Sequence, residues 1–156
     1  MPLTLSPLMT YRADFTAPDV VGPGPFGVRQ IFTTTGGVAK GERLSGTLRA
    51  AGGDWLLAGA DGFGRLDARA TIETDDGALI YVSCAGVVEL SERAMQALTT
   101  GQSTEFGEIK FITQHRFETG DPRYAWINSA VCVAEGRLLP GPAVEYDVCE
   151  VVASTA

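Results

Sequence analysis

The stretch that decides the fold is residues 65–82, which read RLDARATIETDDGALIYV. Apolar and polar residues alternate before the Asp76-Gly77 pair, and a second apolar run follows it. Successive side chains of a β-strand point to opposite faces, so this pattern predicts two antiparallel strands joined by a tight turn. Asp-Gly is typical of the type I′ turn, in which both central residues have positive φ. The stretch therefore predicts a β-hairpin from Arg65 to Val82.

The rest of the chain repeats short apolar or alternating runs between turns rich in Gly and Pro, and Gly36-Gly37 is one of the expected turns. The runs predict about nine strands, near residues 7–16, 27–35, 43–50, 54–59, 64–74, 78–88, 107–117, 124–135 and 143–152. Strands at this spacing are typical of an all-β, mainly antiparallel sandwich or barrel. No linker or internal repeat interrupts residues 1–156, so we expect a single domain.

One short helix is expected from Glu92 to about Thr100. Ser91 is a favourable N-cap, because its hydroxyl can accept a hydrogen bond from the free N–H groups of the first turn. Gly101 can adopt the left-handed conformation that ends a helix. The apolar side of this helix carries only Met95 and Leu98. The helix is therefore expected to lie outside the sheet or to plug one end of a barrel.

Composition narrows the class of protein. Twelve basic residues against nineteen acidic ones give a net charge of −7, which disfavours nucleic acid as a partner. No apolar run approaches the roughly 20 residues that span a bilayer, and the first five residues lack the features of a secretory signal. These features predict no membrane association and a cytoplasmic location. Three widely spaced cysteines predict buried free thiols rather than a disulfide framework.

No motif for a cofactor or a metal is found. The chain has neither a P-loop nor a G-x-G-x-x-G turn between a strand and a helix. Its single histidine, His115, has no nearby Cys or carboxylate cluster with which to form a zinc site. No nucleophile-elbow pattern occurs either. The sequence therefore predicts neither a cofactor nor a metal.

Several segments, in order and at their spacing, resemble one known family. They are Val20-Val21-Gly22, Gly27-Val28-Arg29, Gly36-Gly37, Gly41-Glu42-Arg43-Leu44-Ser45-Gly46, Gly52-Gly53-Asp54-Trp55, Asp61-Gly62, Leu66-Asp67-Ala68-Arg69, Thr74-Asp75-Asp76-Gly77-Ala78-Leu79-Ile80-Tyr81, Phe117-Glu118-Thr119-Gly120 and Trp126-Ile127-Asn128. The resemblance is to domain of unknown function 3237, also called uncharacterised protein family 0311. It covers nearly the whole chain and implies a single closed or nearly closed antiparallel barrel of the calycin or lipocalin type. It implies little about activity.

Asp67 and Arg69 are the candidate catalytic pair. They share one face of the 64–74 strand with Arg65, Thr71 and Glu73. The pattern alone is that of a half-buried strand with a solvated outer face. The resemblance favours the other arrangement, because the Leu66-Asp67-Ala68-Arg69 element is among the family's most recognisable features. If that face lines the barrel, Asp67 can act as a general base and Arg69 can stabilise negative charge on a substrate.

Six further residues are candidates for substrate binding. Trp126 and Asn128 share one face of the expected 124–135 strand and offer an apolar surface beside an amide. Asp54 and Trp55 follow Gly52-Gly53 at an expected barrel rim, where Asp54 can instead cap its turn. Tyr81 can point inward or pack as a core or interface residue. His115 is a candidate because histidine titrates near neutrality.

Three functional hypotheses follow. The first is a cofactor-independent enzyme that acts on an apolar, oxygenated small molecule by proton transfer, as an isomerase, cyclase, lyase or hydratase. The second is a barrel that binds such a molecule without changing it. The third is an assembly protein, in which the 124–134 strand forms a homo-oligomer interface.

Overall fold

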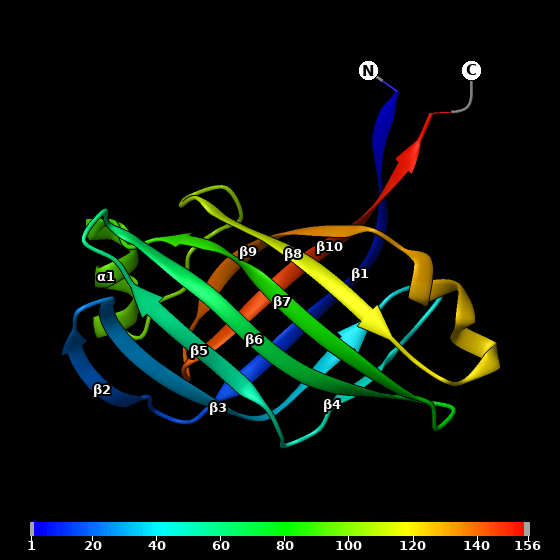
Figure 1. The fold of residues 1–156 in the computed structure, drawn as a ribbon, viewed down its shortest axis with the longest axis horizontal. Helices are drawn as coiled ribbons and strands as arrows, with labels where there is room; N and C mark the ends of the chain where they lie inside the picture. The colour runs from blue at the N-terminus through cyan, green and yellow to red at the C-terminus, as the bar shows by residue number, and fades with distance from the viewer. Residues whose placement is uncertain (1, 155–156) are drawn as a thin grey trace.

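The computed structural model describes residues 2–154, and strands and helices occur along the whole of this range (Figure 1). The strands are β1 (Leu3–Phe15), β2 (Asp19–Gly24), β3 (Gly27–Lys40), β4 (Gly46–Leu48), β5 (Gly53–Ala58), β6 (Phe63–Thr74), β7 (Leu79–Glu89), β8 (Phe111–Glu118), β9 (Cys132–Leu139) and β10 (Ala143–Ala153). Residues 2–154 contain two helices, the α-helix α1 (Glu92–Thr100) and the 3-10 helix η1 (Pro122–Ser129). None of the helices within residues 2–154 is long and apolar enough to cross a membrane.

The strands form one antiparallel sheet that closes on itself, which confirms the prediction of an all-β barrel. The order runs β1-β10-β9-β8-β7-β6, and β4 and β5 then both bridge β6 to β3. β1 pairs with β10 along most of its length and with β3 from Thr10 to Phe15, and this second pairing completes the ring. In Figure 1 the outer ends of β1 and β10 continue beyond the ring as a two-stranded ribbon.

The ring closes at a pair of glycines that the sequence predicted to be a turn. Gly36 and Gly37 instead lie within the long strand β3. A Cβ atom at Gly37 would stand 1.9 Å from the Arg12 carbonyl oxygen on β1. Only glycine lets the two backbones approach this closely. The pair therefore marks the place where β3 crosses from its β2 and β5 partners to β1.

Alternating side chains fill the interior of the ring. Along β8, every second residue from Phe111 to Phe117 is buried, and the residues between them are exposed. β6 follows the same rule, with Leu66 and Ile72 inside. The limits of other strands are less well predicted. β8 begins four residues later than expected, and β2 was not predicted at all.

The predicted hairpin is present, but its turn is of another type. β6 and β7 pair from Phe63–Glu89 to Glu73–Leu79, as the sequence indicated. Gly77 has a φ of +91°, whereas no residue other than glycine has positive φ within the described chain. Asp76 therefore cannot occupy a type I′ turn. The Gly77 N–H donates to the Thr74 carbonyl, as in a type I turn followed by a left-handed glycine.

The predicted 124–135 strand is wrong over its first half. Residues 122–129 form η1, whose first turn is capped by the Asp121 side chain accepting from the Arg123 N–H, with Pro122 at the start. Proline is favourable at the first helical position and lacks the N–H that a sheet would use. β9 begins only at Cys132. The two-sided apolar strand on which the homo-oligomer hypothesis depended is therefore absent.

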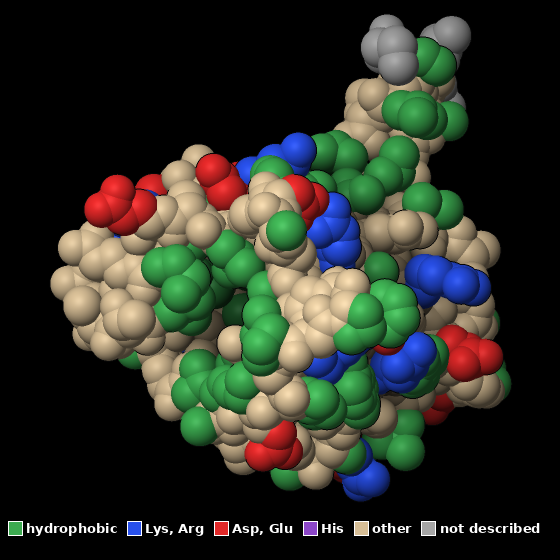
Figure 2. Space-filling model, turned by 60° about the vertical axis from the view of Figure 1, so that its left-hand side comes forward, with side chains coloured by type: hydrophobic (Ala, Val, Ile, Leu, Met, Phe, Trp, Pro, Cys, Tyr) green, Lys and Arg blue, Asp and Glu red, His purple; other side chains and the backbone are tan. Residues whose placement is uncertain are grey.

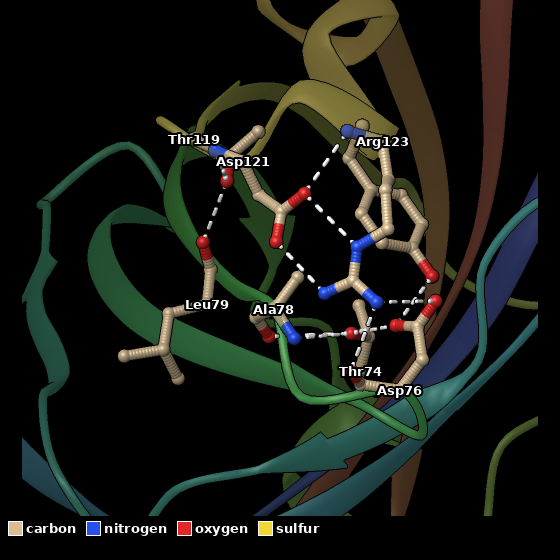
Figure 3. A network of polar contacts seen from close by, with 8 residues as sticks. Thr74, Asp76, Ala78, Leu79, Thr119, Asp121 and Arg123 are labelled. Carbon is tan, nitrogen blue, oxygen red and sulfur yellow. Dashed lines mark hydrogen bonds and ion pairs between the residues drawn. The ribbon is translucent and has the colours of Figure 1, made fainter.

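η1 is fastened to the β6–β7 turn by charged side chains. Figure 3 shows the Arg123 guanidinium between two carboxylates. It lies 2.8 Å from Asp121 and 3.3 Å from Asp76, and the Tyr124 hydroxyl donates to Asp76 at 2.8 Å. The Thr119 hydroxyl adds a bond to the Leu79 carbonyl at 2.7 Å. These contacts hold η1 against the β6–β7 hairpin at one end of the ring.

α1 lies at the opposite end of the ring from η1 (Figure 1). The Ser91 side chain accepts from the Ala94 N–H and Gly101 has a φ of +65°, so both predicted caps are confirmed. The helix buries Ala94 and Ala97, while Met95 and Leu98 stay partly exposed at the mouth of the interior.

Candidate active site in the barrel interior

The α1 end of the barrel contains an apolar cavity of about 250 Å³. Its wall includes three phenylalanines, Phe15, Phe32 and Phe111, with Met95 and Leu98 of α1 at the mouth. Figure 2, which turns this end toward the viewer, shows hydrophobic side chains around a hollow. The polar side chains of the lining are Asp54 and Gln30. A few convergent polar groups in an apolar cavity are typical of a small-molecule site.

Asp54 is placed inside the barrel by the alternation of β5. Asp54, Leu56 and Ala58 line the cavity, and Trp55 between them faces outward. The Asp54 side chain is 8% exposed. The β5–β6 pairing is interrupted between Asp54–Ala68 and Leu57–Arg65, and there the Asp54 carboxylate accepts the Asp67 backbone N–H at 3.0 Å.

This environment changes the acidity of Asp54. Burial raises the pKa of its carboxyl from 3.8 to about 6, because the charged form loses its solvation. The Asp67 N–H bond and, more weakly, Arg29 lower the pKa, and the Asp67 charge raises it. Only Oδ1 of Asp54 is engaged, since no described residue donates to Oδ2. Asp54 therefore presents a free carboxylate oxygen that can gain or lose a proton near neutral pH.

Gln30 is the second polar group of the cavity. It lies on β3 opposite Leu56, while Phe32 lies opposite Asp54, so Gln30 and Asp54 are diagonal neighbours on adjacent strands. Such neighbours have Cα atoms about 7–8 Å apart. No described residue makes a hydrogen bond with the Gln30 amide. The amide can therefore donate to, or accept from, a ligand that also contacts Asp54.

A cluster of aromatic side chains lies deeper in the barrel. The rings of Tyr11, His115 and Tyr146 contact one another with centroids 5.0–5.4 Å apart. The Tyr11 hydroxyl is hydrogen-bonded to Nε2 of His115, and the Thr113 hydroxyl lies 3.3 Å from Nδ1. Both ring nitrogens are thus satisfied. Burial lowers the pKa of His115 to about 3, so the ring is neutral.

This cluster stays uncharged, unlike Asp54. Burial raises the pKa values of Tyr11 and Tyr146 well above their ordinary value, and it raises the pKa of Cys84 to about 12. His115 was predicted as a substrate-binding residue. It is 1% exposed and lies behind the cavity wall rather than in it.

The prediction that Asp67 and Arg69 line the interior is wrong. Leu66 and Ala68 face inward, and the side chains of Asp67 and Arg69 are 59% and 51% exposed on the outside. The two do interact, with Arg69 Nη1 3.5 Å from Asp67 Oδ1. The polar face of β6 is therefore the solvated, ion-paired surface that the alternating pattern alone predicted.

Trp55 and Tyr81 also lie outside the barrel. Trp55 is 36% exposed, and its carbonyl accepts from Arg29 at 2.6 Å. Tyr81 is 39% exposed on the outer face of β7. Neither side chain reaches the cavity of Asp54.

Trp126 and Asn128 belong to η1, at the opposite end from the cavity. The Arg43 guanidinium lies 3.6 Å from the centre of the Trp126 ring. The Asn128 amide accepts from the Thr119 N–H at 2.8 Å and donates to the Thr119 carbonyl at 3.0 Å. Their contacts stabilise the η1 segment, and a strand assignment could not have revealed this.

Of the predicted site residues, the structure brings only Asp54 to the cavity and His115 near it. Sequence reasoning missed Gln30, Tyr11 and Tyr146. A signal existed for Gln30, because Val28, Gln30 and Phe32 alternate along one strand. No sequence pattern indicated Tyr11 and Tyr146, because they contact His115 from strands that are far apart in the chain. No group of three or more potential metal ligands occurs within residues 2–154, and the three cysteines are free.

The fold and the cavity define the class: a closed antiparallel barrel with an apolar interior cavity. The family model "Protein of unknown function (DUF3237)" matches residues 3–151. The chain belongs to this family. A relative from Rhodopseudomonas palustris strain TIE-1, named UPF0311 protein, is 37% identical over 114 residues, which cover 73% of this chain and 72% of the relative.

Solved structures agree with this assignment. A β-barrel-like protein from Acinetobacter baumannii AYE has a TM-score of 0.81 and 32% identity, over 97% of this chain and 98% of its own. A protein of unknown function from Rhodopseudomonas palustris has a TM-score of 0.88 and 31% identity, over 96% and 98%. An enzyme from Penicillium herquei has a TM-score of 0.71 at 21% identity, over 97% and 96%, and shares the fold.

Proposed function

We propose that this protein is a small-molecule enzyme in which Asp54 transfers a proton to or from an apolar, oxygenated substrate in the barrel cavity. The observation that carries the proposal is a buried carboxyl in the lining of an apolar cavity, whose Oδ2 accepts no hydrogen bond from any described residue. The reaction class is isomerisation, cyclisation, or the addition or elimination of water, without a cofactor. Asp67 and Arg69 take no part, because their side chains lie outside.

The chemistry follows from the two polar groups of the cavity. The ionised carboxylate of Asp54 removes a proton from a carbon next to a carbonyl, and the electron pair of that C–H bond moves onto the carbonyl oxygen. The Gln30 amide donates a hydrogen bond to this oxygen. Protonated Asp54 then returns the proton to the same or another atom. A pKa of about 6 suits both steps, since proton transfer is most efficient when the catalytic pKa lies near the working pH.

Hydrogen exchange into a simple ketone tests this proposal without knowledge of the natural substrate. The probe is 2-tetralone in D₂O, with loss of the α-hydrogen signal followed by NMR. Wild type should accelerate exchange above the buffer rate. Asp54→Asn should remove the enzymatic exchange by roughly 10²–10⁴-fold, the usual contribution of a general base.

Asp67→Asn is the matched control, because it makes the same change on the outer side of the same strand pair. It should exchange the probe at the wild-type rate. Equal exchange by wild type and Asp54→Asn, or a loss confined to Asp67→Asn, would contradict the proposal.

The second candidate is a binding protein that leaves its ligand unchanged. The small number of polar groups in the cavity favours this candidate, since orientation and apolar contact are sufficient for binding. By contrast, the neighbour from Penicillium herquei is called an enzyme, which supports the first candidate because it indicates that this barrel fold is compatible with catalysis. Recovery of unaltered ligand after long incubation, with saturable binding, would favour the binding protein over the enzyme.

A further inference from the structure

The charge around the cavity restricts which ligands it can accept. Asp54 is the one ionisable side chain among the described lining residues, and no Lys, Arg or His joins it there. The nearby cations serve other partners, since Arg29 donates to the Trp55 carbonyl and Arg69 is paired with Asp67 outside. A ligand carboxylate would therefore meet a second negative charge in an apolar space without a cation. Like charges in that situation strongly disfavour joint ionisation.

The hydrogen-bonding capacity of the cavity adds a second restriction. An ionised carboxylate only accepts hydrogen bonds, so the group that meets Oδ2 of Asp54 must be a donor. The Gln30 amide, diagonal to Asp54, can donate to a carbonyl or ether oxygen. A hydroxyl and an oxygen acceptor on one ring system would satisfy both residues.

Size and shape give the third restriction. The apolar cavity of about 250 Å³ is close to the lower end of small-molecule sites, and at its mouth Phe32, Met95 and Leu98 also line a wider hollow of about 530 Å³. Phenylalanine rings form part of its wall, and the ring centroids of Phe15 and Phe32 lie 5.8 Å apart in an edge-to-face arrangement. Such walls favour a flat, apolar ring system of two fused rings.

We propose that the cavity selects neutral, hydroxylated bicyclic molecules, that is phenols or stable enols, and excludes the corresponding carboxylates. This rests on the proposed interior site, and it names the ligand class of that site. The hydroxyl donates to Asp54, the rings occupy the apolar part of the cavity, and a carboxylate is rejected by the charge of Asp54.

The pH dependence of binding isolates Asp54 from its neighbours. Tyr11, Tyr146 and Cys84 have pKa values raised by burial and stay neutral up to alkaline pH, and the pKa of His115 is about 3. The outer charges near Asp54 are Arg29 and Asp67. Between pH 5 and 8, Asp54 is thus the described interior group that changes charge.

Three probes of one ring size test the selection: naphthalene, 2-naphthol and 2-naphthoate. Binding is measured by isothermal titration calorimetry at pH 5 and pH 8. At pH 8, 2-naphthol should bind roughly tenfold or more tightly than naphthalene, because its hydrogen bond goes to a charged acceptor. 2-Naphthoate should not bind at pH 8 and should gain affinity at pH 5, where Asp54 is protonated.

Asp54→Asn should remove both effects, so that 2-naphthol loses its advantage at pH 8 and 2-naphthoate binds equally at the two pH values. Asp67→Asn should keep the wild-type preference among the three probes, and the pH at which 2-naphthoate gains affinity should move slightly lower, because the Asp67 charge is one cause of the raised pKa of Asp54. Naphthalene binding without preference for 2-naphthol, or tight 2-naphthoate binding at pH 8, would overturn the ligand class and leave the interior site standing. Failure of all three probes, with unchanged exchange of 2-tetralone by Asp54→Asn, would overturn the interior site as well.

Discussion

Asp54 and Asp67 lie on neighbouring strands and share one hydrogen bond, yet their carboxylates face opposite sides of the sheet. Asp54 is nearly buried, faces an apolar cavity and has a raised pKa. Asp67 is mostly exposed and paired with Arg69. The same side chain is thus a candidate acid or base on one face and part of a solvated surface on the other. The face of the sheet, rather than the residue type, determines the chemistry.

The largest expected difference between the two aspartates is in stability at neutral and alkaline pH. The pKa of Asp54 rises from 3.8 to about 6 on folding, so the folded state binds a proton more readily than the unfolded state. The free energy of unfolding of wild type therefore loses about 3 kcal/mol from this group as pH rises from 4 to 6. Asp54→Asn, whose amide oxygen can still accept the Asp67 N–H, should recover that amount above pH 6 and nothing below pH 4.

Urea unfolding at pH 4, 5, 6 and 8 measures this difference. Asp67→Asn should remain within about 0.5 kcal/mol of wild type throughout, as expected of a surface substitution. If Asp54→Asn showed no advantage at pH 8, the carboxyl would be as well solvated as Asp67 and the contrast between the two faces would be lost.

Two tyrosines extend the comparison to neutral groups. Tyr11→Phe removes the hydroxyl bonded to Nε2 of buried His115 and leaves that nitrogen unsatisfied, at a cost of about 1–3 kcal/mol. Tyr81→Phe removes a hydroxyl from the outer face of β7 and should cost less than about 0.5 kcal/mol. Thermal unfolding at pH 7 should show a melting temperature several degrees lower for Tyr11→Phe alone. Equal melting temperatures for the two variants would contradict the idea that the buried Tyr11–His115 hydrogen bond stabilises the folded protein.

The smallest expected effect is at Arg69. Its ion pair with Asp67 is exposed, so Arg69→Ala should destabilise the protein by less than about 1 kcal/mol, and high salt should reduce even that effect. Ligand-induced thermal shifts should be the same for Arg69→Ala and wild type. Loss of the ligand shift in this variant would place the outer face of β6 in the binding site and would reverse the comparison.

Much of the fold was predictable because it depends on local pattern. The β6–β7 hairpin follows from alternation, and the limits of α1 follow from Ser91 and Gly101. Errors arose where a residue has two structural uses. Gly36-Gly37 allows either a turn or a close approach of strands, and residues 124–130 are as apolar as a strand but follow a proline that starts a helix.

The site was less predictable, because alternation divides side chains into two sets without saying which set faces inward. For β6 the family resemblance favoured the polar set containing Asp67 and Arg69, whereas the closed ring turns that set outward. For β5 the sequence placed both Asp54 and Trp55 at a barrel rim, where Asp54 could also cap a turn, and only the structure turns Asp54 inward and Trp55 outward.

By itself, then, the sequence determined an antiparallel all-β domain with one capped helix, because strand alternation and helix caps are local properties. Only the tertiary structure decided which carboxylate is buried. Closing β1 onto β3 curls the sheet and assigns each alternating set to the interior or the solvent. That closure brings Asp54, Gln30 and three phenylalanines from the four strands β1, β3, β5 and β8 to one cavity. Desolvation, the physical cause of the raised pKa of Asp54, exists only once that interior has formed.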